Sequence, residues 1–513
     1  MVVKYSTNYI KRIDVKDVFI ATVVSLVIIV LSLLTKSFWG DEIFSINFSS
    51  QSFNDLFKTV ATDYHPPFYF ILLKIWIGIF GESEIPLRVF QALQGILLIL
   101  SSLVLFRKLF PDYMYHPLWV LWILSSELWL FMPMLRYYTL AAILVIVSSY
   151  MFLCWLENAN LRTSTLLLTS YIFLLYTDYP SSIVILLHLI YLFFVKRQLV
   201  LRLVSMDIIS AVFFTPWVFI TIKQVYKLVE SQRVADLNLS LGSIPLKIAY
   251  SIYAFFFGET VYPFEIITIG ALLIIVTVFI VSYKNLKLIL RDRYAWFVLG
   301  LLITGILFTS LVTTFISKHT SFIYTPSRTF FCLAFFYLLL ASVYSSILNK
   351  SLRFLFLGSI LVVNIYGIIN WTMGRHFIMP VYATPWKGVL RELEGRKEKI
   401  LVDESLCYNY YRKILNGTYP DPINPLTAGE LYAFLDKPKI YVIMMGREST
   451  EPEIRGEVIK YIQNNGKKIY ERKYLPLDET YRKFKARILK RDTYDAKLTL
   501  FMYELPGKLS PVD

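Results

Sequence analysis

Acidic and imidazole side chains stand between apolar stretches in the first part of the chain. Asp41 and Glu42 are neighbours in "SFWGDEIFS", and Asp63 and His65 precede the double proline of "TDYHPPFYF". A positioned carboxylate can act as a general base, and prolines that start a helix hold the preceding histidine in place. The alternative is that these groups are ordinary solvated loop charges.

Cationic side chains occur in comparable places further along the chain. Arg136 opens an apolar stretch in "PMLRYYTLA", and Arg328 does so in "YTPSRTFF". A guanidinium matches the shape of a phosphate group, although a single one near a membrane could equally extend to lipid headgroups. Two or three cations from different loops would together clamp one phosphate. Further candidate substrate-binding residues are Arg88, Tyr138, Asp178, Lys318 and His319.

Asp178, in "LLYTDYPSS", has three readings. It fits a second acid of the same site, a ligand for an acceptor, or a charge at a helix terminus.

The elements that must position these residues are membrane helices. Of the 513 residues 56% are hydrophobic and the mean hydropathy is +0.55, above the roughly 45–50% apolar content of soluble domains. The apolar residues form blocks long enough to cross a bilayer as helices. We predict about eleven spans, near residues 17–35, 86–106, 116–133, 137–156, 164–177, 181–195, 203–222, 263–283, 294–316, 328–348 and 354–372. The shorter apolar stretches 66–80 and 244–264 are predicted to be interfacial or re-entrant helices on the outer face.

The net charge of +15 does not indicate nucleic-acid binding. The basic residues form short clusters between apolar blocks, as cytoplasmic loops do under the positive-inside rule. With those loops in the cytoplasm, the candidate residues and the C-terminus face the outside. The first apolar block lacks a small-residue cleavage site, so it is expected to be retained. The three cysteines show no disulfide or zinc spacing.

Charges become frequent from about Thr384, and the apolar runs shorten. "KILVDES", "KIYVIMMG" and "LTLFMYEL" have the pattern of short buried strands, and "AGELYAFLD" and "EPEIRGEVIKYIQNNG" that of helices. The alternation predicts a small α/β domain outside the membrane. We therefore expect a transmembrane domain over 1–376, with outer loops 36–85 and 223–262, and a soluble extracytoplasmic domain over 384–513.

Taken in order, these stretches resemble a known family. "GDE" after the first span, "DYHPPFYFILLKIWIGIFGESEIPLR", "LRYYTLA", "YTDYPSS" and "PSRTFF" are similar to the membrane glycosyltransferases of the GT-C fold. They look like the branch that contains the protein O-mannosyltransferases and the aminoarabinose transferase of lipid A. The resemblance covers about residues 15–375, and "TPWKGVLREL" looks like the start of the outer domain in this group.

The resemblance implies a reaction. Members take a sugar from a polyprenyl-phosphate carrier and pass it to an acceptor with inversion, at the outer face of the membrane. It implies that Asp41 is the catalytic carboxylate and that Glu42 supports it. It also implies that His65 lines the cleft and that Arg136 and Arg328 stabilise the departing carrier phosphate.

The chain also departs from the family pattern. Where some relatives have a second acid shortly after the position of Arg136, this sequence has Tyr137, Tyr138 and Thr139. Asp178 is a candidate to replace that acid. The sugar-recognition repeats of eukaryotic protein O-mannosyltransferases and the "WWDYG" signature of oligosaccharyltransferases are missing from the sequence. A divalent metal ion stays open, since the outer acids could hold one but the sequence does not require it.

The main alternative to an enzyme is a transporter of polyprenyl-linked glycans or lipids. Transporters more often carry ionisable groups near the middle of the membrane and show internal repeats, whereas the ionisable groups here collect at one face. A glycan ligase that uses larger polyprenyl-linked donors would share the same outer site.

Overall fold

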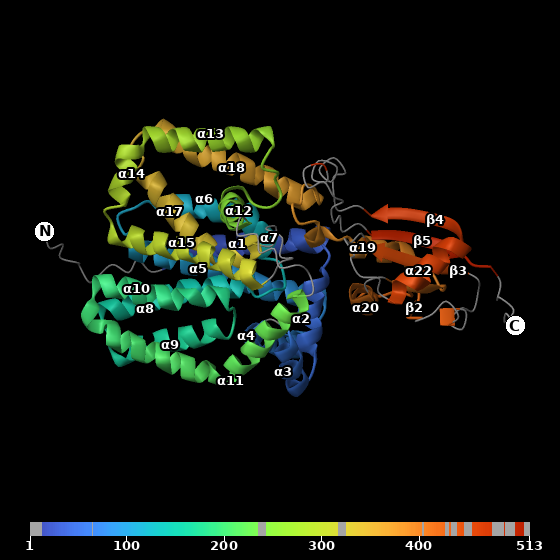
Figure 1. Ribbon diagram of the computed structural model, residues 1–513. Coiled ribbons are helices and arrows are strands. Elements are labelled where there is room, and N and C mark those ends of the chain that lie inside the picture. The colour runs from blue at the N-terminus through green and yellow to red at the C-terminus, as the bar shows by residue number, and fades with distance from the viewer. Residues whose placement is uncertain are drawn as a thin grey trace. The chain divides into compact units, whose positions relative to one another are not determined.

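The computed structural model describes residues 13–63, 65–233, 243–316, 325–402, 405–425, 430–431, 439–445, 454–474, 487 and 498–506. The chain forms two compact units (Figure 1). The helical unit consists of Met1–Val30 and Asn47–Ile369, and the C-terminal unit of Leu31–Ile46 and Asn370–Asp513. The segment 31–46, which carries Asp41 and Glu42, therefore belongs to the C-terminal unit although it is far away in sequence.

Helices build the helical unit, since lipid offers the backbone no hydrogen-bond partners. Three helices cross the boundary between the units, α1 (Val15–Thr35), α2 (Gly40–Ser50) and α18 (Lys350–Met373). The others are α3 (Phe53–Thr62), α4 (Phe68–Phe80), α5 (Glu84–Leu109), α6 (His116–Ile123), α7 (Ser126–Phe131), α8 (Tyr138–Glu157), α9 (Leu161–Leu175), η1 (Pro180–Ser182), α10 (Ile183–Val195), η2 (Arg197–Leu199), α11 (Val200–Arg233), α12 (Ser243–Phe257), α13 (Ile266–Val281), α14 (Tyr283–Ile289), α15 (Arg293–Ile316), α16 (Thr325–Thr329), η4 (Phe330–Cys332) and α17 (Leu333–Ser346).

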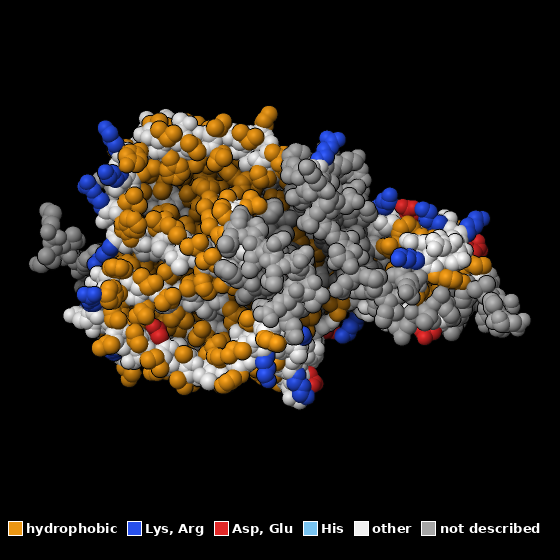
Figure 2. Space-filling model, viewed as in Figure 1, with side chains coloured by type: hydrophobic (Ala, Val, Ile, Leu, Met, Phe, Trp, Pro, Cys, Tyr) orange, Lys and Arg blue, Asp and Glu red, His pale blue; other side chains and the backbone are white. Residues whose placement is uncertain are grey.

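Seven of the described helices are long and apolar enough to cross a membrane, and the protein is an integral membrane protein. The apolar windows of α5, α8 and α17 are 61%, 61% and 78% buried, so these helices lie inside the bundle, whereas that of α11 is only 28% buried. Figure 2 shows a broad apolar surface over the helices, with basic side chains at the end where α14 lies. The orientation in the membrane stays a prediction.

The predicted span 116–133 is wrong as a single helix. The structure ends α6 at Ile123 and begins α7 at Ser126. The physical reason is a helix start inside the apolar run, because the Ser125 hydroxyl accepts a hydrogen bond from the Leu128 amide at 2.9 Å. The two short stretches expected beside the membrane form α4 and α12, with 13 and 15 residues. Helices of this length are shorter than a perpendicular span requires.

A five-stranded mixed sheet forms the core of the C-terminal unit, in the order β2-β1-β3-β5-β4. β1 pairs in parallel with β2 and β3, whereas β5 is antiparallel to β3 and β4. Val458, Ile459 and Ile462 of α22 belong to the hydrophobic core that covers this sheet. The elements are η5 (Pro380–Ala383), α19 (Trp386–Leu393), β1 (Lys399–Val402), α20 (Ser405–Ile414), β2 (Pro422–Ile423), β3 (Lys439–Met445), α22 (Ile454–Asn465), β4 (Lys467–Tyr474) and β5 (Leu498–Glu504).

The three predicted strands are confirmed as β1, β3 and β5, and the helix predicted in "EPEIRGEVIKYIQNNG" is α22. Most of the predicted helix "AGELYAFLD" lies outside the described residues. The sequence gives no apolar signal for β4, "KKIYERKY", because this strand lies at the edge of the sheet and is mostly exposed. Lysines are common on such edges, where they discourage pairing with another chain.

Candidate active site

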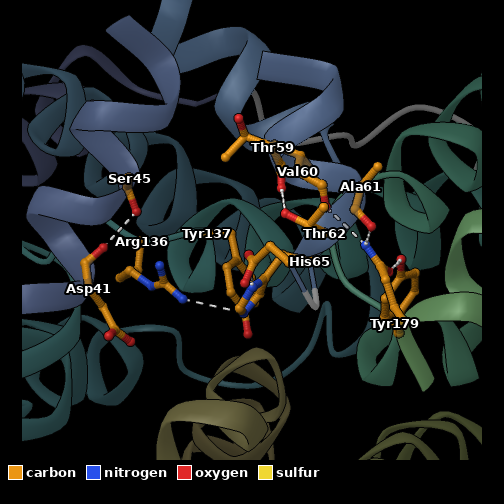
Figure 3. Close-up of polar contacts among 12 residues, drawn as sticks. Asp41, Ser45, Thr59, Val60, Ala61, Thr62, His65, Arg136, Tyr137 and Tyr179 are labelled. Carbon is orange, nitrogen blue, oxygen red and sulfur yellow. Dashed lines mark hydrogen bonds and ion pairs between the residues drawn. The ribbon is translucent and has the colours of Figure 1, made fainter. Parts of the chain in front are cut away.

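The candidate site of the helical unit is centred on His65, which lies between α3 and α4. Its Nδ1 is 2.7 Å from Oδ2 of Asp63, and the two side chains are 13% and 12% exposed. Two arginines approach the other ring nitrogen. Nη2 of Arg136 and Nη1 of Arg328 lie 3.3 Å and 3.2 Å from Nε2 (Figure 3 shows Arg136 and His65).

These contacts determine the protonation state of His65. A guanidinium has only N–H donors, so Nε2 must accept from both arginines. The single ring proton then lies on Nδ1 and is donated to the Asp63 carboxylate. Burial lowers the pKa of His65, and the two arginines lower it further, against the opposing effect of Asp63. His65 is therefore neutral at pH 7 and acts as an acceptor that orients the two cations.

Tyr137 completes this cluster, which we call the His65 cluster: Asp63, His65, Arg136, Tyr137 and Arg328. The rings of Tyr137 and His65 are 5.0 Å apart, and the guanidinium carbons of Arg136 and Arg328 lie 5.6 and 5.9 Å from the Tyr137 ring. Arg328 also donates a hydrogen bond to the Tyr137 hydroxyl. Burial raises the pKa of Tyr137, so its hydroxyl stays protonated and can donate in turn.

The ends of α3 and α4 hold Asp63 and His65 in place. Gln224 of α11 donates to the Val60 carbonyl at 2.9 Å, and the Tyr179 hydroxyl donates to Gln224 at 2.8 Å. On the other side of His65, the Phe68 amide donates to the Tyr176 carbonyl at 2.9 Å. Pro66 and Pro67 stiffen the segment between these anchors. The segment that carries the histidine is thus held by α11 and by the residues that follow α9.

Helix α5 holds the turn that presents Arg136. Arg88 donates to the Pro133 carbonyl and lies 3.7 Å from Glu84. Gln91 donates to the carbonyls of Met134 and Arg136. The hydrogen bond of Arg88 thus supports the backbone of the turn that presents Arg136, and substrate binding by Arg88 stays a prediction.

Asp178 lies next to the cluster and has a structural contact of its own. Its Oδ2 accepts from the Ser181 amide at 2.9 Å at the start of η1. Burial raises the pKa of the Asp178 carboxyl, while the Ser181 hydrogen bonds and the charge of Arg328 oppose that rise. Tyr138 is buried below the cluster, with its ring 4.9 Å from that of Tyr137.

Asp41 and Glu42 lie in the C-terminal unit, in the first turn of α2. Oε2 of Glu42 accepts from the Trp39 amide at 3.1 Å, and the Glu42 amide donates to the Trp39 carbonyl at 3.0 Å. The side-chain contact is one half of a capping box, in which an acid in the first turn reaches back to the amide at the start of the helix. The Asp41 carbonyl accepts from the Ser45 hydroxyl at 2.9 Å (Figure 3). Glu42 is buried, whereas Asp41 is partly exposed, so the two neighbouring acids differ in their surroundings.

The segment before Asp41 is fastened to the C-terminal unit. The Phe38 amide donates to the Tyr411 hydroxyl, and the Ser37 hydroxyl accepts from the Lys387 amide at 3.0 Å. The Trp39 ring meets Tyr382 edge to face at 5.1 Å, and Lys36 donates to the Trp371 carbonyl. Residues 36–39 are all buried.

Several site residues had no signal in the sequence. Tyr137 and Tyr138 both follow Arg136, and the sequence alone does not show which of these two tyrosines belongs to the cluster. Gln91 and Gln224 contact backbone groups 43 and 164 residues away, which no local pattern reveals. Lys318 and His319, both predicted to bind substrate, lie outside the described residues.

A metal site does not follow from the described part of the chain. Within it, no three His, Cys, Asp or Glu side chains gather as ligands for an ion.

The chain was compared with known proteins. No family model and no curated protein matches its sequence. The solved structure of ArnT from Cupriavidus metallidurans in the apo state matches with a TM-score of 0.50 at 12% identity, over 94% of this chain and 97% of that one. The same protein bound to undecaprenyl phosphate matches at 0.49 and 12% identity, over 96% and 99%.

A further match is the archaeal oligosaccharyltransferase AglB from Archaeoglobus fulgidus, in complex with an inhibitory peptide and a dolichol-phosphate. Its TM-score is 0.44 at 13% identity, over 83% of this chain and 69% of that one. The predicted architecture, a helical membrane protein with a small C-terminal mixed sheet, is confirmed by the apo ArnT match. The chain has the GT-C membrane fold of ArnT.

Proposed function

We propose that the protein is an inverting glycosyltransferase. It transfers a sugar from a polyprenyl-phosphate-linked donor to an acceptor (a protein, lipid or glycan) at the outer face of the membrane. The motif resemblance and the shared GT-C fold support this assignment. The observation that carries it is the convergence of Arg136 and Arg328 on one neutral histidine nitrogen.

The contacts of the two arginines favour a role in phosphate binding. Their distances to Nε2, 3.3 and 3.2 Å, are longer than the roughly 2.7–2.9 Å of a guanidinium bound to an oxyanion. An imidazole nitrogen is a neutral acceptor, whereas a phosphate oxygen is charged and stronger. A phosphate that reached this site would therefore compete well for both guanidiniums, while Asp63 and His65 keep them close together.

The proposed reaction needs a carboxylate that accepts a proton and donors that stabilise the departing phosphate. The acceptor oxygen forms a bond to the anomeric carbon of the sugar as the bond from that carbon to the carrier phosphate breaks. The acceptor proton passes to a carboxylate, a role that the resemblance assigns to Asp41. Negative charge grows on the departing phosphate, and preorganised cations and the Tyr137 hydroxyl stabilise it. Attack from the face opposite the phosphate inverts the configuration.

The test is transfer by the purified protein from a polyprenyl-phosphate monosaccharide to a panel of acceptors. The expected product has the anomeric configuration opposite to that of the donor. Arg328→Gln is expected to lower kcat by about 10²–10³-fold, the cost of removing one group that stabilises transition-state charge. Arg162→Gln removes an exposed arginine of the same unit and should leave the rate unchanged. Retention of the donor configuration, or equal rates in both variants, would contradict the proposal.

A further inference from the structure

A basic hollow opens on the C-terminal unit, and none of the residues that the proposed reaction uses lines it. Its volume is about 700 Å³, within the range of pockets that hold small ligands. The residues that line it are Arg396, Lys397, Asn409, Arg412, Lys413, Gly417, Thr418, Tyr419 and Asp421. We refer to it as the basic hollow.

Three segments build its walls. Asn409, Arg412 and Lys413 of α20 are spaced i, i+3 and i+4, so they share one face of that helix. Arg396 and Lys397 follow the tight turn at Gly395, whose φ of +76° suits glycine. The loop 417–421 supplies the third wall.

The hollow is held rigidly. The Gly395 amide donates to the Thr418 carbonyl at 2.8 Å, which ties the turn to the loop. The buried Tyr408 hydroxyl donates to the Pro420 carbonyl at 2.8 Å, which ties the loop to α20. The Ile400 amide donates to the Asp421 carbonyl at 3.0 Å, which continues the pairing of β1 with β2. A ligand would therefore meet a preformed surface and lose little affinity to ordering it.

The charge of the hollow is positive. Four cationic side chains line it against one acid, Asp421. Arg412 contacts this acid, and Lys399 lies 3.2 Å from it, so its charge is largely committed. Among the described residues no ion pair joins Arg396 or Lys397 to an acid. These two cations remain available to an anion.

The other lining groups suit hydroxyls. Asn409 supplies an amide, and Thr418 and Tyr419 supply hydroxyls, the hydrogen-bonding groups that bind sugar hydroxyls in both directions. A bare phosphate would use the cations and leave these groups to water. We propose that the basic hollow binds a phosphorylated saccharide. In this proposal the cations bind its phosphate, and the Asn409 amide forms hydrogen bonds with the hydroxyls of its sugar.

This inference is independent of the proposed transferase activity, because binding is measured without turnover. The full-length protein in detergent is titrated with glucose 6-phosphate, inorganic phosphate, glycerol 3-phosphate and glucose by calorimetry. The double variant Arg396→Gln/Lys397→Gln is compared with Lys460→Gln/Lys467→Gln, which removes two exposed cations of the same unit outside the hollow. The cations of the His65 cluster are the same in both variants, so the difference isolates the hollow.

We expect glucose 6-phosphate to bind more tightly than the other three probes. The Arg396/Lys397 variant should weaken that binding about tenfold, and the Lys460/Lys467 variant should not change it. Asn409→Ala, on an exposed helical position that tolerates alanine, should remove the preference for glucose 6-phosphate over inorganic phosphate and leave the affinity for inorganic phosphate unchanged.

Three results would overturn the proposal. Equal weakening by both double variants would mean that the charge of the whole unit matters and the hollow does not. Equal affinity for inorganic phosphate and glucose 6-phosphate would show that the hollow does not recognise the sugar part of the ligand. Tighter binding of glycerol 3-phosphate would identify a phospholipid headgroup as the ligand instead.

Discussion

At the scale of single residues, the neutral state of His65 is the feature with the clearest consequence. Both arginines need the lone pair on Nε2, and a second ring proton would replace that attraction with repulsion. In this structure Nε2 therefore has no proton to donate, and its lone pair is engaged by the two arginines. Its proposed contribution is to hold the two like charges of Arg136 and Arg328 side by side, where one phosphate could contact both.

The pH dependence of the melting temperature tests whether His65 is neutral in the folded protein. The pKa of His65 is lowered from its ordinary 6.5, so the unfolded chain binds the proton more tightly than the folded one. The contribution of His65 to the free energy of unfolding is therefore at its maximum above pH 6.5, and it falls as the pH drops below 6.5. His65→Gln keeps an acceptor and removes the titration. Its melting temperature is expected to fall less than that of the wild type between about pH 6.5 and 5. A parallel fall in both proteins would show that His65 is not buried neutral.

Asp41 and Glu42 are expected to differ when they are neutralised. In Glu42→Gln the amide oxygen can still accept from the Trp39 amide, so stability and transfer should stay near the wild-type values. In Asp41→Asn the proposed base is lost, and kcat should fall by about 10²–10⁴-fold with little change in melting temperature.

Asp112→Asn, at an exposed position, is the matched control for loss of one carboxylate. Full activity of Asp41→Asn together with loss of activity in Glu42→Gln would reverse the assignment of the two acids.

At the scale of elements, the attachment of residues 36–39 to the C-terminal unit suggests what that unit does for the proposed site. It holds the start of α2 through Tyr411, Lys387 and Tyr382. Tyr411→Phe would leave the buried Phe38 amide without this acceptor, at a cost of about 1–3 kcal/mol. We expect a lower melting temperature and a lower kcat with an unchanged KM for the donor.

Tyr226→Phe, at a position 66% exposed, provides the control for loss of a hydroxyl. If Tyr411→Phe lowered the melting temperature but left kcat intact, the unit would stabilise the chain without positioning Asp41.

A second junction joins α7 to the loop after α12. The Ser126 hydroxyl donates to the Phe257 carbonyl at 2.9 Å, and a side chain at Gly258 would clash with Ser126. Close packing here buries Glu259, whose carboxylate oxygens have no hydrogen-bond partner among the described residues. Burial raises the pKa of Glu259 well above its ordinary 4.5.

The raised pKa predicts the effect of Glu259→Gln. The Glu259 carboxyl holds its proton more tightly in the folded protein than in the unfolded chain. The free energy of unfolding is therefore unaffected by ionisation of this group below pH 4.5, and it declines as the pH rises above 4.5. Glutamine does not ionise. The melting temperature of Glu259→Gln relative to the wild type should therefore increase from about pH 5 to 8. A difference that is constant over this range would contradict the buried acid, and Glu157→Gln, at an exposed position, should show no trend.

At the scale of the whole molecule, the membrane architecture and the strands β1, β3 and β5 could be predicted because both follow from local patterns of apolar residues. The break at Leu124 could not, since one serine cap interrupts an otherwise apolar run. The edge strand β4 was missed because it has little apolar surface to bury.

The candidate site could be predicted only in part, because residue types are visible in the sequence but contacts between distant segments are not. Asp63, His65, Arg136 and Arg328 were singled out from sequence by type and place, and the structure brings these four together. Sequence could not show that His65 accepts from both arginines, or that Arg88 supports the backbone behind them. It also gave no sign that residues 31–46 belong to the C-terminal unit. Each of these depends on contacts between segments far apart in the chain.

The central claim is that Arg136 and Arg328 hold the carrier phosphate, and direct binding of a polyprenyl phosphate to the purified protein tests it without knowledge of the sugar or the acceptor. We predict that Arg136→Gln and Arg328→Gln each weaken binding at least about tenfold, as loss of a charge-assisted hydrogen bond would. Arg162→Gln and the variant Arg396→Gln/Lys397→Gln should bind like the wild type. Wild-type affinity in both Arg136→Gln and Arg328→Gln would contradict the account.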